Sequence, residues 1–144
     1  MPLPEAITGL QFPVLLWRKG YSYVASEPLE LCTHPRSLFA DTRRRARANE
    51  FCLADAAGRI YEISDFEAIR PFGGVKRVGH FLLRSVFAAP VFRSVKQPEL
   101  AEFRAIISKA LRARFGRALG AQLDDVHSTQ QVLAVVADRD KKSG

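Results

Sequence analysis

The sequence has little cysteine and no long apolar run, and each shortage excludes a class of protein. Only two cysteines occur among 144 residues, too few for the disulfide framework of small secreted domains, so we expect both thiols to be reduced. Residues 1–20 lack a positively charged start, and the apolar run at 12–17 ends at Arg18. We therefore expect no signal peptide and no membrane span, which predicts a cytoplasmic protein with no membrane partner.

Acidic residues are also in short supply. The chain has 15 Asp and Glu against 22 Lys and Arg, a net charge of +7, which favours polyanions, acidic proteins or anionic lipids as partners. Arginine with abundant alanine is equally typical of a GC-rich genome, so charge alone leaves the partner open. The hydrophobic content of 47% is ordinary for a globular protein, and we expect one domain at 1–137 with a flexible tail at 138–144.

The first part of the chain has the composition of strands. Residues 12–18 and 21–24 are rich in apolar and aromatic types around Gly20, and "LELC" at 29–32 continues that extended pattern. A helix that opens with Pro35 follows and carries the arginine-rich run. The clearest signal is a hairpin in "EFCLADAAGRIYEI", with Asp55-Ala56-Ala57-Gly58 as a type I turn between two apolar strands.

The second part of the chain has the composition of helices. Ser64 predicts the cap of a single helical turn before Pro71, residues 80–87 fit helix or strand equally, and a strand follows Pro90. An amphipathic helix begins near Pro98 and ends at Gly116, and a second one starts at Ser128. The order predicts an α+β fold, a small antiparallel sheet with C-terminal amphipathic helices packed on one face.

The motifs for catalysis and cofactor binding are incomplete. Gly74 and Gly79 have the spacing of a phosphate-binding loop, but His80 and Phe81 replace the Lys-Ser/Thr pair that should follow. Cys32, His34 and Cys52, with isolated histidines at 80 and 127, do not have the repeated spacing of a zinc site. We expect no metal, no cofactor and no catalytic residues, with both cysteines buried and inert.

Two groups of residues are candidates for binding a partner, and both also have a structural interpretation. Trp17, Arg18, Lys19, Tyr21 and Tyr23 surround a strand turn, and these residue types dominate interface hot spots, but aromatic side chains also simply fill sheet faces. Four arginines, Arg43, Arg44, Arg45 and Arg47, would neutralise phosphates or simply form a solvated helix edge.

Several stretches together resemble small bacterial immunity proteins that neutralise polymorphic or contact-delivered toxins. These are "WRKGY" at 17–21, "ADAAGRIYEI" at 54–63, the following "IRPFGG", and the amphipathic helix from Pro98. The resemblance is one of layout over residues 12–115, and it implies a cofactor-free module that binds one cognate toxin. Immunity proteins against nucleases are often acidic, so the charge of +7 implies another kind of toxin, or one with an acidic face.

Our leading hypothesis from the sequence is a non-catalytic protein that binds and neutralises a cognate toxin in the cytoplasm. The alternative is a basic nucleic-acid-binding protein that uses the run from Arg43 to Arg47. The two differ in salt dependence, because phosphate contacts weaken steeply with salt and a packed protein interface does not. The oligomeric state stays open.

Overall fold

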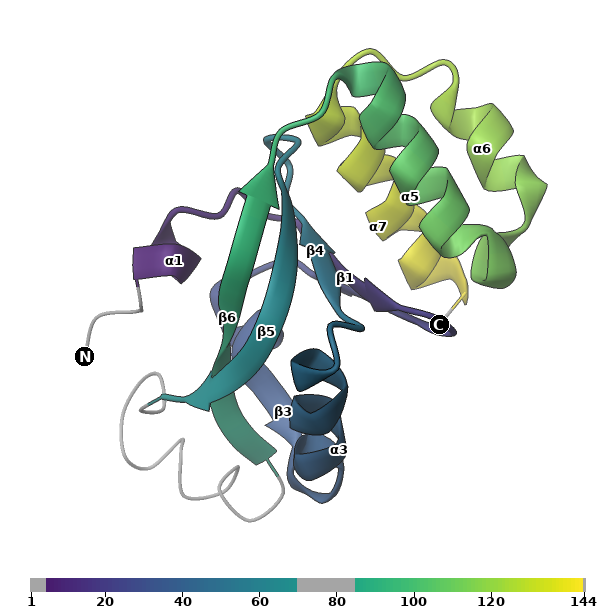
Figure 1. Ribbon diagram of the computed structural model, residues 1–144. Coiled ribbons are helices and arrows are strands. Elements are labelled where there is room, and N and C mark those ends of the chain that lie inside the picture. The colour runs from purple at the N-terminus through teal and green to yellow at the C-terminus, as the bar shows by residue number, and fades with distance from the viewer. Residues whose placement is uncertain (1–4, 70–84, 144) are drawn as a thin grey trace.

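A curled antiparallel sheet of six strands forms the centre of the computed structural model (Figure 1), in the order β2-β1-β4-β5-β6-β3. The structure describes residues 5–69 and 85–143. The strands are β1 (Val14–Arg18), β2 (Tyr21–Ala25), β3 (Thr33–Pro35), β4 (Cys52–Ala54), β5 (Ile60–Ala68) and β6 (Ser85–Lys96). The helices are α1 (Glu5–Thr8), α2 (Pro28–Cys32), α3 (Arg36–Arg47), α5 (Leu100–Phe115), α6 (Arg117–Leu123) and α7 (Thr129–Ser143).

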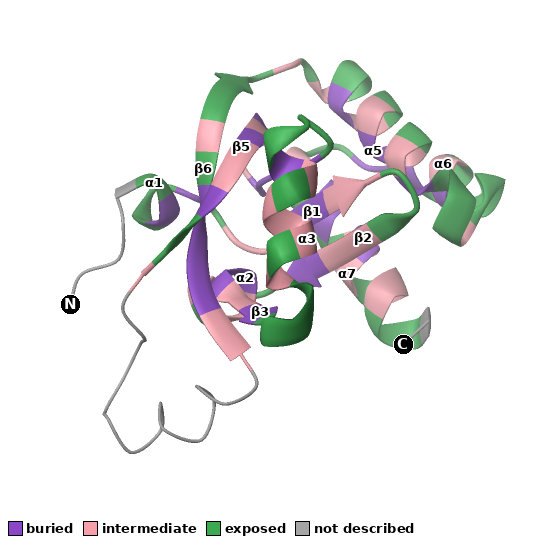
Figure 2. Ribbon diagram, turned by 60° about the horizontal axis from the view of Figure 1, so that its bottom comes forward, coloured by how far each residue is buried: buried purple, intermediate pink, exposed green. Residues whose placement is uncertain are grey.

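Alternating side chains give the sheet two apolar faces. Leu16, Leu53 and Tyr61 contribute to one core, which α1, α2 and α3 help to cover. Leu15 and Ile60 contribute to the other, which is closed by the C-terminal helices α5, α6 and α7. The predicted α+β fold is therefore confirmed, and Figure 2 shows buried residues along the strands and on the inward sides of the helices.

The predicted hairpin is present, with its turn at the expected residues. Leu53 pairs with Tyr61 and Ala54 with Ile60, and the Gly58 N–H donates to the Asp55 carbonyl at 3.1 Å, which closes the turn. The fully buried Asp55 carboxylate accepts backbone N–H bonds in this region, at 3.0 to 3.3 Å. It also pairs with the Arg59 guanidinium at 2.8 Å. A buried carboxylate with this many donors holds the turn together.

Two local predictions are wrong. Residues 29–32 form most of α2 instead of a strand, because Pro28 starts a helical turn that buries Leu31 and Cys32. Ser64 does not cap a helix: β5 continues to Ala68, and the register shifts around Ser64 because of a bulge, where its Oγ bonds the Val91 carbonyl. A bulge reorients the side chain that follows it, and here that side chain is Asp65.

The remaining boundaries follow from caps and stops. Helix α3 starts at Arg36, one residue later than expected. Helix α5 ends at Phe115, and the next residue, Gly116, has a φ of +72° that suits a helix stop. The Ser128 hydroxyl accepts the Gln131 N–H at 3.2 Å and caps α7 as predicted.

Helix α7 continues beyond Ala137 to Ser143, into the segment predicted to be a flexible tail. Residues 85–87 are strand, whereas residues 80–84 and the stretch at 73–79 considered as a phosphate-binding motif lie outside the described residues. No helix in the described ranges is long and apolar enough to cross a membrane.

Candidate functional site

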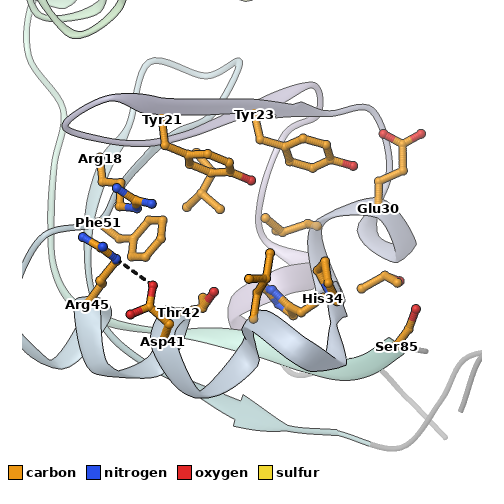
Figure 3. Close-up of a pocket in the computed structure, with 15 residues that line it drawn as sticks. Arg18, Tyr21, Tyr23, Glu30, His34, Asp41, Thr42, Arg45, Phe51 and Ser85 are labelled. Carbon is orange, nitrogen blue, oxygen red and sulfur yellow. Dashed lines mark hydrogen bonds and ion pairs between the residues drawn. The ribbon is translucent and has the colours of Figure 1, made fainter. Parts of the chain in front are cut away.

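A groove opens between the hairpin β1–β2 and helix α3, on the face of the sheet away from the C-terminal helices (Figure 3). Its volume is about 540 Å³. The curl of the sheet turns its edge strands β2 and β3 towards this space, and α2 links them. We call it the hairpin groove; its polar and aromatic lining includes Arg18, Tyr21, Tyr23, Glu30, His34, Asp41, Thr42, Arg45 and Phe51.

Aromatic rings form the hairpin side of the groove. Tyr21 packs edge-on against Phe51 with ring centroids 6.3 Å apart. The Arg18 guanidinium lies 5.3 Å from the Tyr21 centroid and 5.9 Å from that of Phe51, so one cation is shared between two rings. Partial burial raises the pKa values of Tyr21 and Tyr23, and both phenols stay neutral hydrogen-bond donors at physiological pH.

Helix α3 forms the opposite side of the groove. Leu38, Asp41, Thr42 and Arg45 lie at helical spacing and so share one face. The Arg45 Nε donates to Asp41 Oδ2 at 2.8 Å, and Arg44 also pairs with this carboxylate. Hydrogen bonds from Arg45 and Arg44 lower the pKa of Asp41 to about 2. This side of the groove therefore presents a paired, ionised carboxylate beside an apolar leucine.

A buried histidine lies in the floor. The His34 Nε2 is 3.1 Å from the Ala88 carbonyl oxygen, and its ring contacts Phe66 edge-on at 4.9 Å. Burial lowers the pKa of His34, so the neutral tautomer with Nε2–H donates to that carbonyl. Next to it, burial raises the pKa of Cys32 to about 12. A thiol that stays protonated is a poor nucleophile, and these two residues form part of the core.

The arginine run is paired with carboxylates of the chain itself. Arg43 bonds Asp65 at 3.2 and 3.3 Å and Arg47 bonds it at 3.1 Å. Arg45 also reaches Glu50 at 3.3 Å, in addition to its bond with Asp41. The bulge in β5 places Asp65 opposite α3. The four arginines form ion pairs with three carboxylates, those of Asp41, Glu50 and Asp65.

The predicted binding residues fall on both sides of the sheet. Arg18, Tyr21, Tyr23 and Arg45 line the hairpin groove. Trp17 and Lys19 line a second groove beside α5, to which Arg18 also contributes. The other predicted residues, Arg43, Arg44 and Arg47, line neither groove and take part in the ion pairs described above.

Sequence reasoning missed several residues of the groove, chiefly Glu30, His34, Leu38, Asp41 and Phe51. The sequence does contain a signal for the α3 side of the groove, because Leu38, Asp41 and Arg45 have the spacing of neighbours on one helix face. No cluster of three or more His, Cys, Asp or Glu side chains suited to a metal ion occurs within residues 5–69 and 85–143.

Comparisons with known proteins add no family to this picture. No protein-family model matches the chain, and neither the curated proteins nor the solved structures searched include a match.

Proposed function

We propose that this protein is a non-catalytic immunity protein, which binds a cognate toxin protein in the cytoplasm and neutralises it through the hairpin groove. The observation that carries the proposal is the convergence of Tyr21, Tyr23, Arg18 and Arg45 on one open groove. Tyrosine and arginine dominate the centres of protein interfaces, because they combine a large contact area with directed hydrogen bonds.

The groove offers an occupant both apolar and polar contacts. Leu38 is 56% exposed and Tyr21 43% exposed, so both side chains expose apolar surface to water in the unbound protein. Burying such side chains against a partner favours association. The neutral phenols and the paired Asp41 would then select a partner that offers matching hydrogen-bond donors and acceptors.

The ion pairs of α3 weigh against the nucleic-acid alternative. Phosphate binding needs arginines that can exchange water and counterions for phosphate. In this protein Arg43 and Arg47 already share Asp65, and Arg44 and Arg45 share Asp41. A phosphate would have to compete with a carboxylate for each of these arginines. The overall charge of +7 would also speed the encounter with an acidic partner protein.

The test combines capture with a growth assay. Tagged protein is exposed to nuclease-treated extract of the source cells, and the captured proteins are identified after a wash at physiological salt. The gene of each stoichiometric candidate is then expressed in a host with and without this protein. We expect one candidate that arrests growth alone and is harmless when the two are expressed together.

A groove variant locates the interface. Tyr21→Ser with Leu38→Ser removes two exposed contacts without opening a core cavity, and we expect capture and growth rescue to be lost. The matched control is Val91→Ser with Leu29→Ser, at positions 37% and 42% exposed that do not line the hairpin groove. Rescue by the groove variant would contradict the assignment of the interface. Nucleic acid retained alone and released by salt would favour the alternative function.

A further inference from the structure

The C-terminal helices leave part of their sheet face uncovered. Ala54 and Ile60 pair across β4 and β5 and lie in the helix-covered core. The next cross-strand row on the same face is Trp17, Cys52, Glu62 and Ser94, each opposite the next in the register of β1, β4, β5 and β6. Directly opposed residues point to the same side of a sheet. This row therefore faces the helical layer beside α5, where it lines an open groove.

The open row and the side of α5 enclose a groove of about 730 Å³, which we call the helix groove. Its helical wall consists of Ile106, Lys109, Ala110 and Ala113, which are neighbours at helical spacing on α5. The adjacent stripe of α5, with Phe103, Ile107 and Leu111, is buried in the core. The small side chains of Ala110 and Ala113 let another chain approach the helix closely, and the half-buried Trp17 and the buried Ile60 provide apolar contacts.

The rim of this groove is basic. Lys19, Lys96 and Lys109 line it and are exposed, and none of the ion pairs found among the described residues involves them. The acidic side chain in the lining, Glu62, is paired with Arg93. The positive charge also acts at Cys52 in the floor of the groove. Burial raises the pKa of this thiol, and the charges of Arg93 and Lys96 act in the opposite direction.

We infer that the helix groove is a second docking surface, whose occupant is an acidic amphipathic segment of a partner protein. The apolar side chains of the segment would contact Trp17, Ile60 and Ala110, and its carboxylates would pair with the three rim lysines. This surface is distinct from the hairpin groove, and the inference holds whether or not the partner is a toxin.

Charge and surface chemistry select this occupant over others. A second copy of this chain carries a net charge of +7, and the ion-paired carboxylates of α3 and its neighbourhood are not available to the lysines. Association of two copies here would therefore be opposed by like charge. Sites for single-stranded nucleic acid combine positive charge with exposed aromatic faces on which bases stack, whereas Trp17 is half-buried at the side of α5.

The experiment uses a library of random peptides displayed on phage and selected on the full-length protein. We expect the enriched peptides to combine aspartate or glutamate with leucine, isoleucine or phenylalanine. Trp17 is the single tryptophan of the chain, so peptides of the enriched sequences, made without tryptophan, should change its fluorescence saturably. The same peptides should slow alkylation of Cys52, the half-buried cysteine in the groove, relative to the unbound protein.

A blocked variant and a matched control assign the binding to this groove. Ala113→Glu places a carboxylate at an exposed groove position on α5, and Ala105→Glu places one at an exposed position of the same helix outside the groove. Glutamate is well tolerated in helices, so both variants should fold. We expect Ala113→Glu to weaken peptide binding about tenfold or more, as a like charge does at an interface, and Ala105→Glu to leave it nearly unchanged.

The lysines are tested in the same way. Lys19→Glu with Lys109→Glu should weaken binding about tenfold, whereas Lys141→Glu with Lys142→Glu on α7 changes the net charge equally and should not. Enriched peptides without acidic residues, or acidic peptides that bind Ala113→Glu as well as the unaltered protein, would overturn the inference. Fatty acids that displace the peptides with higher affinity would overturn the choice of a protein segment.

Discussion

The ion pairs around Asp65 are the reason for assigning the arginine run a structural role, and the substitution Asp65→Asn tests that reasoning directly. The Asp65 carboxylate forms ion pairs with the guanidinium groups of Arg43 and Arg47, with N···O distances of 3.2 and 3.1 Å. Its Oδ1 also accepts the Phe66 N–H at 2.8 Å. The hydrogen bond from Arg43 is the main cause that lowers the pKa of Asp65 from 3.8 to about 2, with Arg47 contributing. An amide of the same shape keeps the packing and loses the charge.

The size of the effect follows from that lowered pKa. A fully expressed shift from 3.8 to about 2 would correspond to roughly 2.5 kcal/mol at neutral pH. The site is near the surface, with the Asp65 side chain 28% exposed, and solvent screens such pairs. We therefore expect Asp65→Asn to lower the free energy of unfolding by about 1 kcal/mol at pH 7.

The pH dependence gives the direction of the test. The folded protein holds Asp65 ionised below its ordinary pKa of 3.8, so its stabilisation is complete above about pH 5 and is lost as pH falls towards 2. In urea unfolding, the difference between the unaltered protein and Asp65→Asn should be constant from pH 7 to 5 and shrink below pH 4. The control is Glu67→Gln, which removes an exposed charge from the same strand.

A second readout addresses function. Asp65→Asn releases Arg43 and Arg47 from their carboxylate, so its affinity for nucleic acid should rise and depend more steeply on salt, by about one additional phosphate contact or more. An unchanged stability difference at every pH, together with nucleic-acid binding no stronger than that of Glu67→Gln, would refute the claim that Asp65 neutralises the run.

Three further predictions test the β4–β5 turn and the floor of the hairpin groove. Asp55→Ala should cost about 3 to 4 kcal/mol in urea unfolding, because buried backbone donors and an arginine lose their acceptor; a cost below 1 kcal/mol would contradict that role. Gly58→Ala should be more destabilising than Gly20→Ala. Both glycines have positive φ, but a Cβ at Gly58 would lie 2.7 Å from Thr129 Cγ2, whereas a Cβ at Gly20 would meet no atom within 4 Å. Equal losses of stability in the two variants would contradict this steric argument. Burial lowers the pKa of His34, so the folded state favours the neutral ring and stability should fall as pH drops below about 6.5; His34→Gln should remove that part of the pH dependence, and identical pH profiles would contradict it.

The elements that the sequence predicted correctly are those with local signals. The hairpin at 51–63 has apolar alternation on both sides of an Asp–Gly turn, and α5 has an apolar stripe with Gly116 as its stop. The Ser128 cap made the start of α7 predictable. Each of these signals lies within a few residues of the element it specifies, so no tertiary information was needed.

The errors occurred where tertiary contacts decide the local structure. Residues 29–32 have the composition of a strand, but as α2 they turn Leu31 and Cys32 into the core and connect the two edges of the sheet. At Ser64 a bulge looks like a turn in sequence, because both interrupt the alternation of apolar residues. Single-sequence propensity does not distinguish these cases.

The candidate site was predictable only in part for the same reason. The aromatic and basic residues of the hairpin were evident as a group, whereas Glu30, His34 and Asp41 reach the groove because the sheet curls. The arginine run shows the limit most clearly, since Asp65 lies 18 and 22 positions from Arg47 and Arg43. A charge run therefore cannot be interpreted until its intramolecular partners are known.

The two grooves share one structural element, the β1–β2 hairpin. Arg18 and Tyr21 are paired on the side of the hairpin groove, whereas Trp17 and Ser22 are paired on the side of the helix groove. Arg114 of α5 donates to the Ser22 carbonyl and Oγ at 3.3 and 2.9 Å, which attaches the hairpin to the helical layer. The two grooves are thus held at a fixed distance and orientation, and a partner that wraps around the hairpin would contact both at once. Binding in one groove would then raise the effective concentration of the partner at the other groove, and so raise the overall affinity.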